Sequence, residues 1–489
     1  MRVRLKTIAS LFSLILVDLL AYYVSVFCAV FFRQNFRALF NFKYIFSQEN
    51  ASLFIYSFYY MASIWWMPVA FIIVQQFEKL YMARYPFWEE TRVILKSATV
   101  SIVFMLLTIT VRNMYGSIPR SVFVFLWFFL IIIVSFLRYW GKRFFYRIGI
   151  WKEQVLIIGI GENAIAAVEG LEKERHLGYK VIGFLEESGK RIKEIKIKNK
   201  NYRVYQGIKN ISKFVNLLKI DTVFIANPTS EQEKMTEMIN EIYKYVKRVI
   251  IIPNIKGIAI FNSELHYLFM EKLFLIKINN NLNSTPNIII KRAFDIFFSL
   301  FIMVLILPLF LLLMLLVKLD SEGPIFYTQK RVGKNGREFK IIKFRTMYKD
   351  SSVRLKNILK KDPKVRLEWE KNFKLKNDPR VTPVGRFLRK TSLDELPQII
   401  NVLRGEMSWV GPRPVVRQEI EKYYGSYKQY YYSVYPGLAG LWQVSGRSDT
   451  DYDFRIQTDA WYVQNWSLWL DLIILFKAVF VVLKREGAY

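Results

Sequence analysis

The sequence is short of the residues that most often build disulfides, metal centres and general bases. Only one cysteine, Cys28, and two histidines, His176 and His266, occur among 489 residues. A single cysteine excludes a disulfide within the chain. No thiol or imidazole follows His266, so carboxylates and hydroxyls must carry any nucleophilic or acid–base chemistry of the C-terminal part.

Acidic residues are also few compared with basic ones. The chain has 71 lysines and arginines against 40 aspartates and glutamates, which gives a formal net charge of +31. That balance favours a polyanionic partner, either nucleic acid or an anionic membrane face. The hydrophobic content of 53% and several long apolar runs favour the membrane. We therefore expect a membrane partner and no nucleic acid.

Four apolar runs in the first 150 residues predict a four-helix transmembrane bundle. With the N-terminus inside, the inner segments hold 11 lysines and arginines and the outer loops hold 5. The positive-inside rule then places both ends of this region in the cytoplasm. Asp18 lies in mid-membrane and is a functional candidate by position, although an ion pair with a neighbouring helix or protomer is favoured. The predicted spans are 8–32, 53–74, 93–111 and 121–137.

The sequence pattern changes after residue 153. Strand-like runs alternate there with helical patterns, which predicts a parallel α/β sheet. Gly159 and Gly161 follow the first run in a Gly-x-Gly-x-x-Ala pattern, the phosphate turn of Rossmann domains, and Glu186 lies at the distance of a ribose contact. A domain of this kind can keep the turn and lose its ligand, so a bound nucleotide is only one alternative. The strand-like runs are 154–160, 181–185, 222–226 and 249–252.

A polar run at 279–286 marks a further boundary. We expect three domains: four transmembrane helices at 1–150, a Rossmann-like α/β domain at 151–278, and a mainly α-helical domain at 279–489.

A fifth apolar run, 293–317, opens the third domain. By length it could span a bilayer, but a fifth crossing would place the following domain outside the cytoplasm. Lysine or arginine flanks the run on both sides, whereas a span should show asymmetry. Pro308 removes a backbone hydrogen bond within it. We therefore predict a helix that enters the inner leaflet, breaks at Pro308 and returns, with a plain transmembrane helix as the alternative.

Two adjacent acids, Asp394 and Glu395, are the strongest candidates for chemistry. Apolar residues downstream recur at helical spacing, with Ser392 as the expected N-cap and Glu395 completing a capping box. Both acids could simply cap this helix. The arginines and lysines on either side instead favour phosphate chemistry with a divalent cation, since arginine binds phosphate oxygens and the cation lets a carboxylate approach them.

The rest of the third domain offers weaker patterns. The segment 323–346 predicts a β-hairpin with its turn at 334–336. The charged segment 351–376 predicts one or two amphipathic helices divided at Pro363, lying on lipid or packed on the domain. The apolar run 468–483 is interrupted by charges and predicts an interfacial or packed helix.

Seven short motifs occur in order in the third domain: Lys291-Arg292-Ala293-Phe294-Asp295, Gly323-Pro324-Ile325-Phe326, Gln329-Lys330-Arg331-Val332-Gly333, Lys343-Phe344-Arg345-Thr346-Met347, Asp394-Glu395-Leu396-Pro397-Gln398, Gly411-Pro412-Arg413-Pro414 and Pro436-Gly437. With these motifs, residues 291–489 resemble the bacterial sugar transferases, the monotopic polyprenyl-phosphate hexose-1-phosphate transferases. The resemblance implies a membrane enzyme that moves a sugar 1-phosphate from a UDP-sugar to undecaprenyl phosphate at the cytoplasmic face of the bacterial inner membrane and releases UMP, for exopolysaccharide, capsule or O-antigen synthesis. It implies the re-entrant helix as well, although the family's usual serine before the proline is Leu307 here.

The resemblance also assigns roles to residues. It implies that Asp394 is a covalent nucleophile that approaches Mg²⁺, and that Glu395 assists in metal binding or proton handling. The sequence at 437–452 looks most like that of galactose-transferring members, while glucose or an N-acetylated sugar stays open. A homodimer is expected by resemblance alone. The candidates for binding phosphate or uridine are Lys343, Arg345, Arg386, Arg389, Arg413 and Arg447.

Two other interpretations concern the middle domain. Membrane helices followed by a Gly-x-Gly-x-x-Ala turn also resemble nucleotide-sugar dehydratases, which use a Tyr-x-x-x-Lys pair; Tyr243 and Lys247 have that spacing. Alternatively, 151–275 is a ligand-sensing or dimerising module that regulates a transferase.

Overall fold

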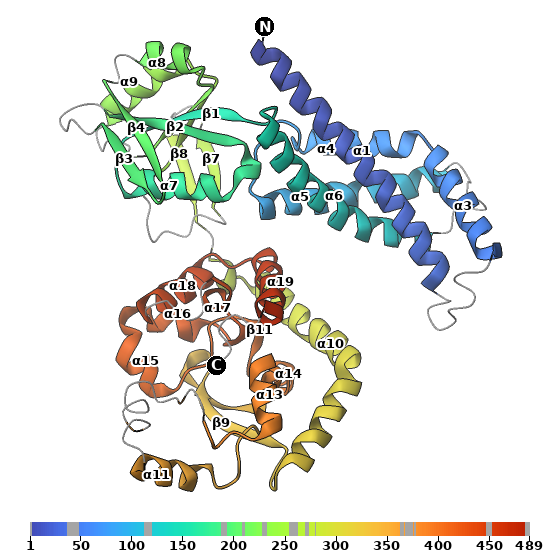
Figure 1. Ribbon diagram of the computed structural model, residues 1–489, viewed down its shortest axis with the longest axis vertical. Coiled ribbons are helices and arrows are strands. Elements are labelled where there is room, and N and C mark those ends of the chain that lie inside the picture. Colours follow the sequence, from blue (N-terminus) through green and yellow to red (C-terminus); the bar gives the residue numbers. More distant parts are fainter. Residues whose placement is uncertain are drawn as a thin grey trace. The chain divides into compact units, whose positions relative to one another are not determined.

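The computed structural model folds into two compact units, Met1–Lys256 and Gly257–Tyr489 (Figure 1). Each unit is considered by itself. The structure describes residues 2–36, 48–111, 120–186, 193–207, 211–226, 232–253, 263–268, 273–278, 280–361, 366, 375, 378–445 and 452–484.

The first unit begins with the predicted membrane helices. A core of buried apolar side chains, including Tyr22, Phe71, Ile94 and Leu130, joins them. Three single helices are long and apolar enough to cross a bilayer, and a bent pair forms a fourth candidate span. The chain is therefore a membrane protein, as its composition predicted. The helices are α1 (Arg2–Phe36), the bent pair α3 (Gln48–Ser63) and α4 (Trp66–Phe77), α5 (Phe87–Val111) and α6 (Ser121–Ile148).

The second predicted span, 53–74, is not one straight helix. It is broken between α3 and α4 with a bend of 55°. Pro68 lies near the start of α4 and has no N–H to donate to the carbonyl of Ile64, which its ring also crowds. The break at Ile64 and Trp65 follows from this proline. The prediction of one span rested on the apolar character of the run and did not take the proline into account.

The fourth predicted span, 121–137, stops too early. Helix α6 continues to Ile148 and carries Arg138 and Lys142 in buried positions. Arg138 forms a bidentate pair with Asp18 at 2.8 and 3.0 Å, and Glu90 accepts from Arg138 at 2.9 Å and from Lys142 at 2.6 Å. Two acids thus balance two bases inside the bundle. Asp18 has its partner on a neighbouring helix, which was the favoured explanation of its position.

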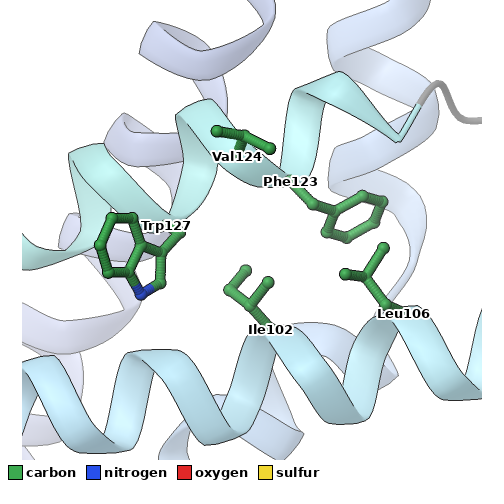
Figure 2. A pocket seen from close by; sticks show the side chains of 5 residues that line it. All are labelled: Ile102, Leu106, Phe123, Val124 and Trp127. Carbon is green, nitrogen blue, oxygen red and sulfur yellow. The ribbon is translucent and has the colours of Figure 1, made fainter.

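The outer surface of the bundle is apolar. Figure 2 shows an apolar hollow between α5 and α6, which suits a surface that faces lipid tails. Its lining consists of Ile102, Leu106, Phe123, Val124 and Trp127.

The α/β domain has the predicted parallel sheet. Strands β4, β2, β1, β5 and β6 lie in that order and are parallel, and β3 adds an antiparallel edge. This order is that of a Rossmann-like half-sheet. The strands are β1 (Glu153–Ile158), β2 (Tyr179–Glu186), β3 (Glu194–Ile197), β4 (Lys200–Gln206), β5 (Thr222–Ile225) and β6 (Arg248–Ile251), and the helices are α7 (Glu162–Lys173), η1 (Arg175–Leu177), α8 (Ile211–Leu218) and α9 (Gln232–Tyr243).

Polar contacts join the membrane helices to this sheet within the first unit. Arg84, between α4 and α5, donates to the carbonyl oxygens of Trp151 and Leu177 at 3.2 and 2.5 Å. Its other terminal nitrogen lies 3.0 Å from Glu153 on β1. The start of the sheet is therefore held directly against the loop that ends the bent pair.

The second unit is mainly helical, with short two-stranded sheets, and contains the 36-residue helix α10 (Thr285–Asp320). The hairpin of β9 (Phe326–Val332) and β10 (Glu338–Phe344) has the predicted turn, η4 (Lys334–Gly336). The other elements are β7 (Glu264–Leu268), β8 (Leu273–Lys277), η3 (Asn281–Asn283), α11 (Ser351–Lys361), α13 (Pro383–Thr391), η5 (Leu393–Glu395), α14 (Gln398–Arg404), β11 (Ser408–Val410), α15 (Arg417–Tyr423), η6 (Gly425–Tyr427), α16 (Lys428–Ser433), β12 (Gly437–Ala439), α17 (Leu441–Ser445), α18 (Tyr452–Gln464) and α19 (Leu468–Lys484).

Helix α10 corrects one expectation. It is helical through Pro308, so the predicted break in the helix at this residue was wrong. Its ribbon instead follows a curved path (Figure 1), as expected where a proline removes one hydrogen bond but neighbouring turns continue. The amphipathic helix α11 lies where one was predicted, while Pro363 falls outside the described residues.

Candidate active site

The acidic pair lies in a turn between two helices. Ser392 has left-handed backbone angles (φ 56°) and ends α13, and its side chain makes no cap hydrogen bond to the 3-10 turn that follows, so no capping box forms. Asp394 and Glu395 belong to the single 3-10 turn η5, and α14 begins after Pro397. The capping prediction failed because α13 runs directly into this turn and uses Ser392 to close its own last turn.

Close backbone packing positions α13 beside the end of the hairpin. Thr382 caps the helix by accepting from the N–H of Gly385 at 2.9 Å. A Cβ on Gly385 would lie 2.2 Å from the carbonyl oxygen of Thr346, so only glycine permits this approach. One turn later, Arg389 donates from Nε to the hydroxyl of Thr346 at 2.9 Å. The helix therefore directs Arg389 toward the hairpin end, which also carries Lys343.

Lys343, on β10, contacts the acidic pair directly. Its Nζ donates to Oε1 of Glu395 at 2.6 Å, and both side chains are about one-quarter exposed. Arg413, in the loop after β11, approaches the same oxygen at 3.8 Å. Residues from β10, η5 and the loop after β11 thus meet at one place, as the sequence motifs predicted for Lys343 and Arg413.

Arg413 owes its position to two glycines. A Cβ on Gly411 would lie 2.6 Å from the carbonyl oxygen of Tyr435, and a Cβ on Gly437 would lie 2.1 Å from the nitrogen of Gly411. The backbone N–H of Gly437 donates to the carbonyl of Pro412 at 2.8 Å. The two motifs that contain these glycines therefore form one tightly packed support for Arg413.

The electrostatics distinguish the two acids. Burial raises the pKa of Asp394 to about 6; Lys343 and Arg389 oppose this shift and Glu395 adds to it. Asp394 is therefore mostly ionised at neutral pH in a place that does not favour its charge. Such a carboxylate gains from a cation or from forming a covalent bond to phosphorus. Glu395, by contrast, is already paired with Lys343.

Other predicted residues lie elsewhere. Arg345 is buried and donates to the carbonyl oxygens of Val317 and Ser321 at 3.3 and 2.5 Å, at the end of α10. Arg345 follows the last residue of β10, and these hydrogen bonds hold its guanidinium at the end of α10. Arg386 is exposed on α13, and Arg447 falls outside the described residues. Gly159 and Gly161 precede α7 in the α/β domain.

Sequence reasoning gave no role to three residues near the site. Thr346 orients Arg389. Asp378 and Arg380 form a largely buried bidentate pair, in which hydrogen bonds from Arg380 hold the pKa of Asp378 below its usual range despite burial. The motif around Thr346 and the Asp-Pro-Arg sequence were visible, but neither pattern states which side chain faces the acids.

A metal site built from the protein alone is not found: no group of three or more His, Cys, Asp or Glu side chains able to hold an ion occurs among the described residues. Asp394 could still be one ligand of a Mg²⁺ ion that takes its other ligands from substrate phosphates and water, which is how Mg²⁺ is commonly held.

Comparison with known proteins gives two family matches. The model of the bacterial sugar transferases matches residues 286–485, and that of a CoA-binding domain matches residues 79–253. A solved Rex-family repressor covers 40% of this chain and aligns over 81% of its own length, with 17% identity and a TM-score of 0.21, which is too low to support any argument.

Three named relatives align over most of their length. The undecaprenyl-phosphate galactose phosphotransferase of Salmonella typhimurium is 41% identical over 84% of both chains. The UDP-galactose-lipid carrier transferase of Erwinia amylovora is 39% identical over 84% of both. The UDP-glucose:undecaprenyl-phosphate glucose-1-phosphate transferase of Klebsiella pneumoniae is 33% identical over 71% of both. With the motifs and the site geometry, these matches show that the chain belongs to the bacterial sugar transferase family.

Proposed function

We propose that this protein transfers a hexose 1-phosphate, most simply galactose 1-phosphate, from a UDP-hexose to undecaprenyl phosphate and releases UMP. The observation that carries the proposal is the position of Asp394 in a half-buried turn, where the charges of Lys343 and Arg389 act on it and Arg413 approaches the neighbouring Glu395. One carboxylate among several fixed cations suits attack on a diphosphate whose charge must be neutralised.

In the first step, an Oδ atom of Asp394 attacks the β-phosphorus of the UDP-hexose. The bond between that phosphorus and the bridging oxygen breaks, and the electron pair leaves with UMP. Asp394 then holds the hexose phosphate as an acyl phosphate. The raised pKa of Asp394, about 6, still leaves it ionised at neutral pH, so the nucleophile needs no separate base.

In the second step, a phosphate oxygen of undecaprenyl phosphate attacks the same phosphorus. The bond from phosphorus to Asp394 breaks, which regenerates the carboxylate and gives undecaprenyl diphosphate hexose. Lys343 and Arg413 lie within reach of Glu395 and are placed to bind the phosphate oxygens through both steps. Arg389, held by Thr346, supplies a further positive charge near Asp394.

We propose Mg²⁺ as the cofactor, with Asp394 as its protein ligand and Glu395 as the nearest second carboxylate. Bound there, the ion would neutralise charge on the diphosphate during transfer. A role for Glu395 in proton handling is less favoured, because its contact with Lys343 keeps it occupied.

The same unit suggests how the site meets its lipid acceptor. Near its start, α10 is held by Arg292, which donates to the carbonyls of Val402 and Leu403 at 2.6 and 2.8 Å. Its end is held by Arg345. Since both ends of α10 are bonded to one folded domain, a crossing that separates them by a bilayer is disfavoured.

The middle of α10 is apolar and exposed, with Val304 at 77%. We propose that this part enters the inner leaflet from the cytoplasmic side and returns, which places Asp394 at the depth of a lipid phosphate. The protein would act at the cytoplasmic face of a bacterial inner membrane. A homodimer is proposed on resemblance alone.

The dehydratase interpretation is disfavoured. Tyr243 ends α9, while Lys247 lies beyond the helix and pairs with Asp221 at 2.9 Å on the surface. The two side chains therefore do not share one helix face toward a cofactor. A regulatory role for the α/β domain is compatible with the transferase.

The test is UMP release by the purified, membrane-reconstituted protein. It is incubated with Mg²⁺, undecaprenyl phosphate and a panel of UDP-sugars. Release that requires both lipid phosphate and metal supports the proposal, and the sugar that responds identifies the donor. No release from any UDP-sugar overturns it. Assaying the detergent extract for a co-purified dinucleotide tests the α/β domain separately.

A further inference from the structure

Four side chains with polar groups, two buried and two partly buried, gather in the second unit. We name them the Trp442 cluster: Tyr424, Trp442, Arg455 and Asp459. Tyr424 and Asp459 are only 1% and 3% exposed. The guanidinium of Arg455 lies 5.0 Å from the ring centre of Trp442, and Asp459 is one helical turn from Arg455 on α18. The hydrophobic cluster formed by Val332, Ile420, Tyr431 and Ile456 packs beside them.

Every member of the cluster has a buried polar atom with no hydrogen-bond partner. These atoms are the hydroxyl of Tyr424, Nε1 of Trp442, Nε and Nη2 of Arg455, and Oδ2 of Asp459. A buried polar group without a partner is costly, and native proteins keep few of them. Five such atoms on four neighbouring side chains make this cluster a candidate place for a polar ligand.

Charged residues connect the cluster to the active site. Glu419 lies 3.8 Å from Nη1 of Arg455 and accepts a hydrogen bond from Tyr452 at 2.5 Å. Arg331, on β9, is influenced by the charges of both Glu419 and Arg413, and burial lowers its pKa. Arg413 in turn approaches Glu395. These pairs form a chain of interacting charged side chains from the cluster to the catalytic turn.

The chemistry of the open atoms favours hydroxyl groups. The cluster offers three kinds of donor together with one carboxylate acceptor, and a hydroxyl can serve both at once. Glu419 and Asp459 balance Arg455, so a second phosphate is not required. Burial also raises the pKa of Asp459 to about 7, which favours a neutral partner over a charged one.

A stacked base fits less well. The guanidinium of Arg455 already covers the rings of Trp442 and Tyr452, at 5.0 and 5.1 Å from their centres. A ligand could therefore contact the ring edges of Trp442 and Tyr424, which carry the unpaired Nε1 and hydroxyl groups.

We propose that the Trp442 cluster binds the hexose hydroxyls of the donor and selects among hexoses. This inference rests on the transferase function proposed above. In a UDP-hexose, the hexose and the uridine are attached on opposite sides of the attacked phosphorus. The cluster would therefore contact the hexose and leave the uridine to other residues.

Two conservative variants test this. Trp442→Phe keeps an aromatic ring and removes the Nε1 donor, while Asp459→Asn keeps the shape and removes the charge. We expect each to raise the KM for the UDP-hexose roughly 3- to 10-fold, the effect of one lost hydrogen bond. Asp459→Asn should also change the ratio of kcat/KM for UDP-galactose and UDP-glucose. The inhibition constant of UMP, which lacks the hexose, should stay within about twofold of wild type.

Tyr427→Phe is the matched control, since Tyr427 is a nearby tyrosine, 38% exposed, outside the cluster. A parallel loss of UMP affinity would assign the cluster to the base and overturn the inference. Unchanged KM values would show that the unpaired polar atoms of the cluster bind only water, and would also overturn the inference. Tyr424→Phe provides a third variant if either substitution fails to fold. Wild-type protein that releases no UMP would overturn the proposed function first, and this inference with it.

Discussion

Lys343 and Glu395 lie 52 positions apart in the chain, and their side chains meet at 2.6 Å. The contact joins the hairpin strand β10 to the turn η5 and leaves Asp394 beside it. The contact fixes the carboxylate of Glu395 and leaves that of Asp394 available as the proposed nucleophile. The proposed mechanism depends on this division of roles.

Asp394→Asn should abolish turnover, with a fall of at least about 1,000-fold in UMP release, because an amide cannot form the acyl phosphate. Burial raises the pKa of Asp394 in the folded state, so at pH 7 its charge opposes folding. The variant should therefore melt no lower than wild type. Asp350→Asn, at an exposed ion pair with Arg354, is the control and should keep full activity. Full activity of Asp394→Asn would rule out the covalent mechanism.

The pH dependence of kcat/KM should show an acid limb governed by Asp394. Since the ionised form is the nucleophile and the pKa is about 6, activity should be nearly constant above pH 7. It should fall roughly tenfold per pH unit well below 6. The measurement is UMP release between pH 5 and pH 8 at constant ionic strength. A profile that stays flat down to pH 5 would contradict this assignment.

Lys343→Met and Glu395→Gln should move that limb in opposite directions. Lys343 lowers the pKa of Asp394 and Glu395 raises it. The limb should therefore shift to higher pH without the lysine and to lower pH without the glutamate. Lys343→Met should also reduce kcat/KM roughly 10- to 100-fold through the lost phosphate contact. Shifts of the same sign would show that the two residues act only on the structure.

Arg138→Met should strongly destabilise the membrane bundle. It leaves Asp18 buried without its ion-pair partner and Glu90 with Lys142 alone, and the loss of one partner of a buried pair typically costs about 3–5 kcal/mol. Thermal unfolding in detergent measures the loss. Arg143→Met, on the same helix but contacting only the hydroxyl of Tyr139 among its described hydrogen bonds, should shift the melting temperature far less. Equal shifts would mean that the buried pair has no special role.

The path of α10 can be tested by cysteine labelling, because Cys28 is the only native cysteine. In a Cys28→Ser background, single cysteines replace Thr285 and Glu322, the exposed residues at either end of the helix. A membrane-impermeant thiol reagent should label both from the cytoplasmic face. Labelling from opposite faces would establish a plain transmembrane helix.

The sequence predicted those parts of the fold that depend on local patterns. Alternating apolar runs placed β1, β2, β5 and β6, and the turn around Asn335 placed the hairpin. Local sequence patterns gave the wrong prediction where a contact between residues far apart in the sequence determines the structure. The burial of Arg138 against Asp18 extends α6 beyond its uncharged run. The guanidinium of Arg345 is bound by carbonyl oxygens at the end of α10, a contact that the motif did not predict.

The acidic pair shows the same limit. Ser392 matched a capping rule, but the preceding helix α13 uses it to end its last turn. The motifs identified Lys343, Asp394, Glu395 and Arg413 as one group, yet their spacing in sequence does not show which of them touch. That information comes only from the packing of β10, η5 and the loop after β11.

The most direct test of the mechanism is to look for the covalent intermediate. Protein is mixed with UDP-galactose and Mg²⁺ without lipid, quenched, and mapped by peptide mass spectrometry. The account predicts one hexose phosphate on Asp394, sensitive to hydroxylamine, absent in Asp394→Asn and lost when undecaprenyl phosphate is added. A protein that releases UMP with lipid, yet never carries this adduct, would instead transfer the hexose phosphate directly and contradict the account.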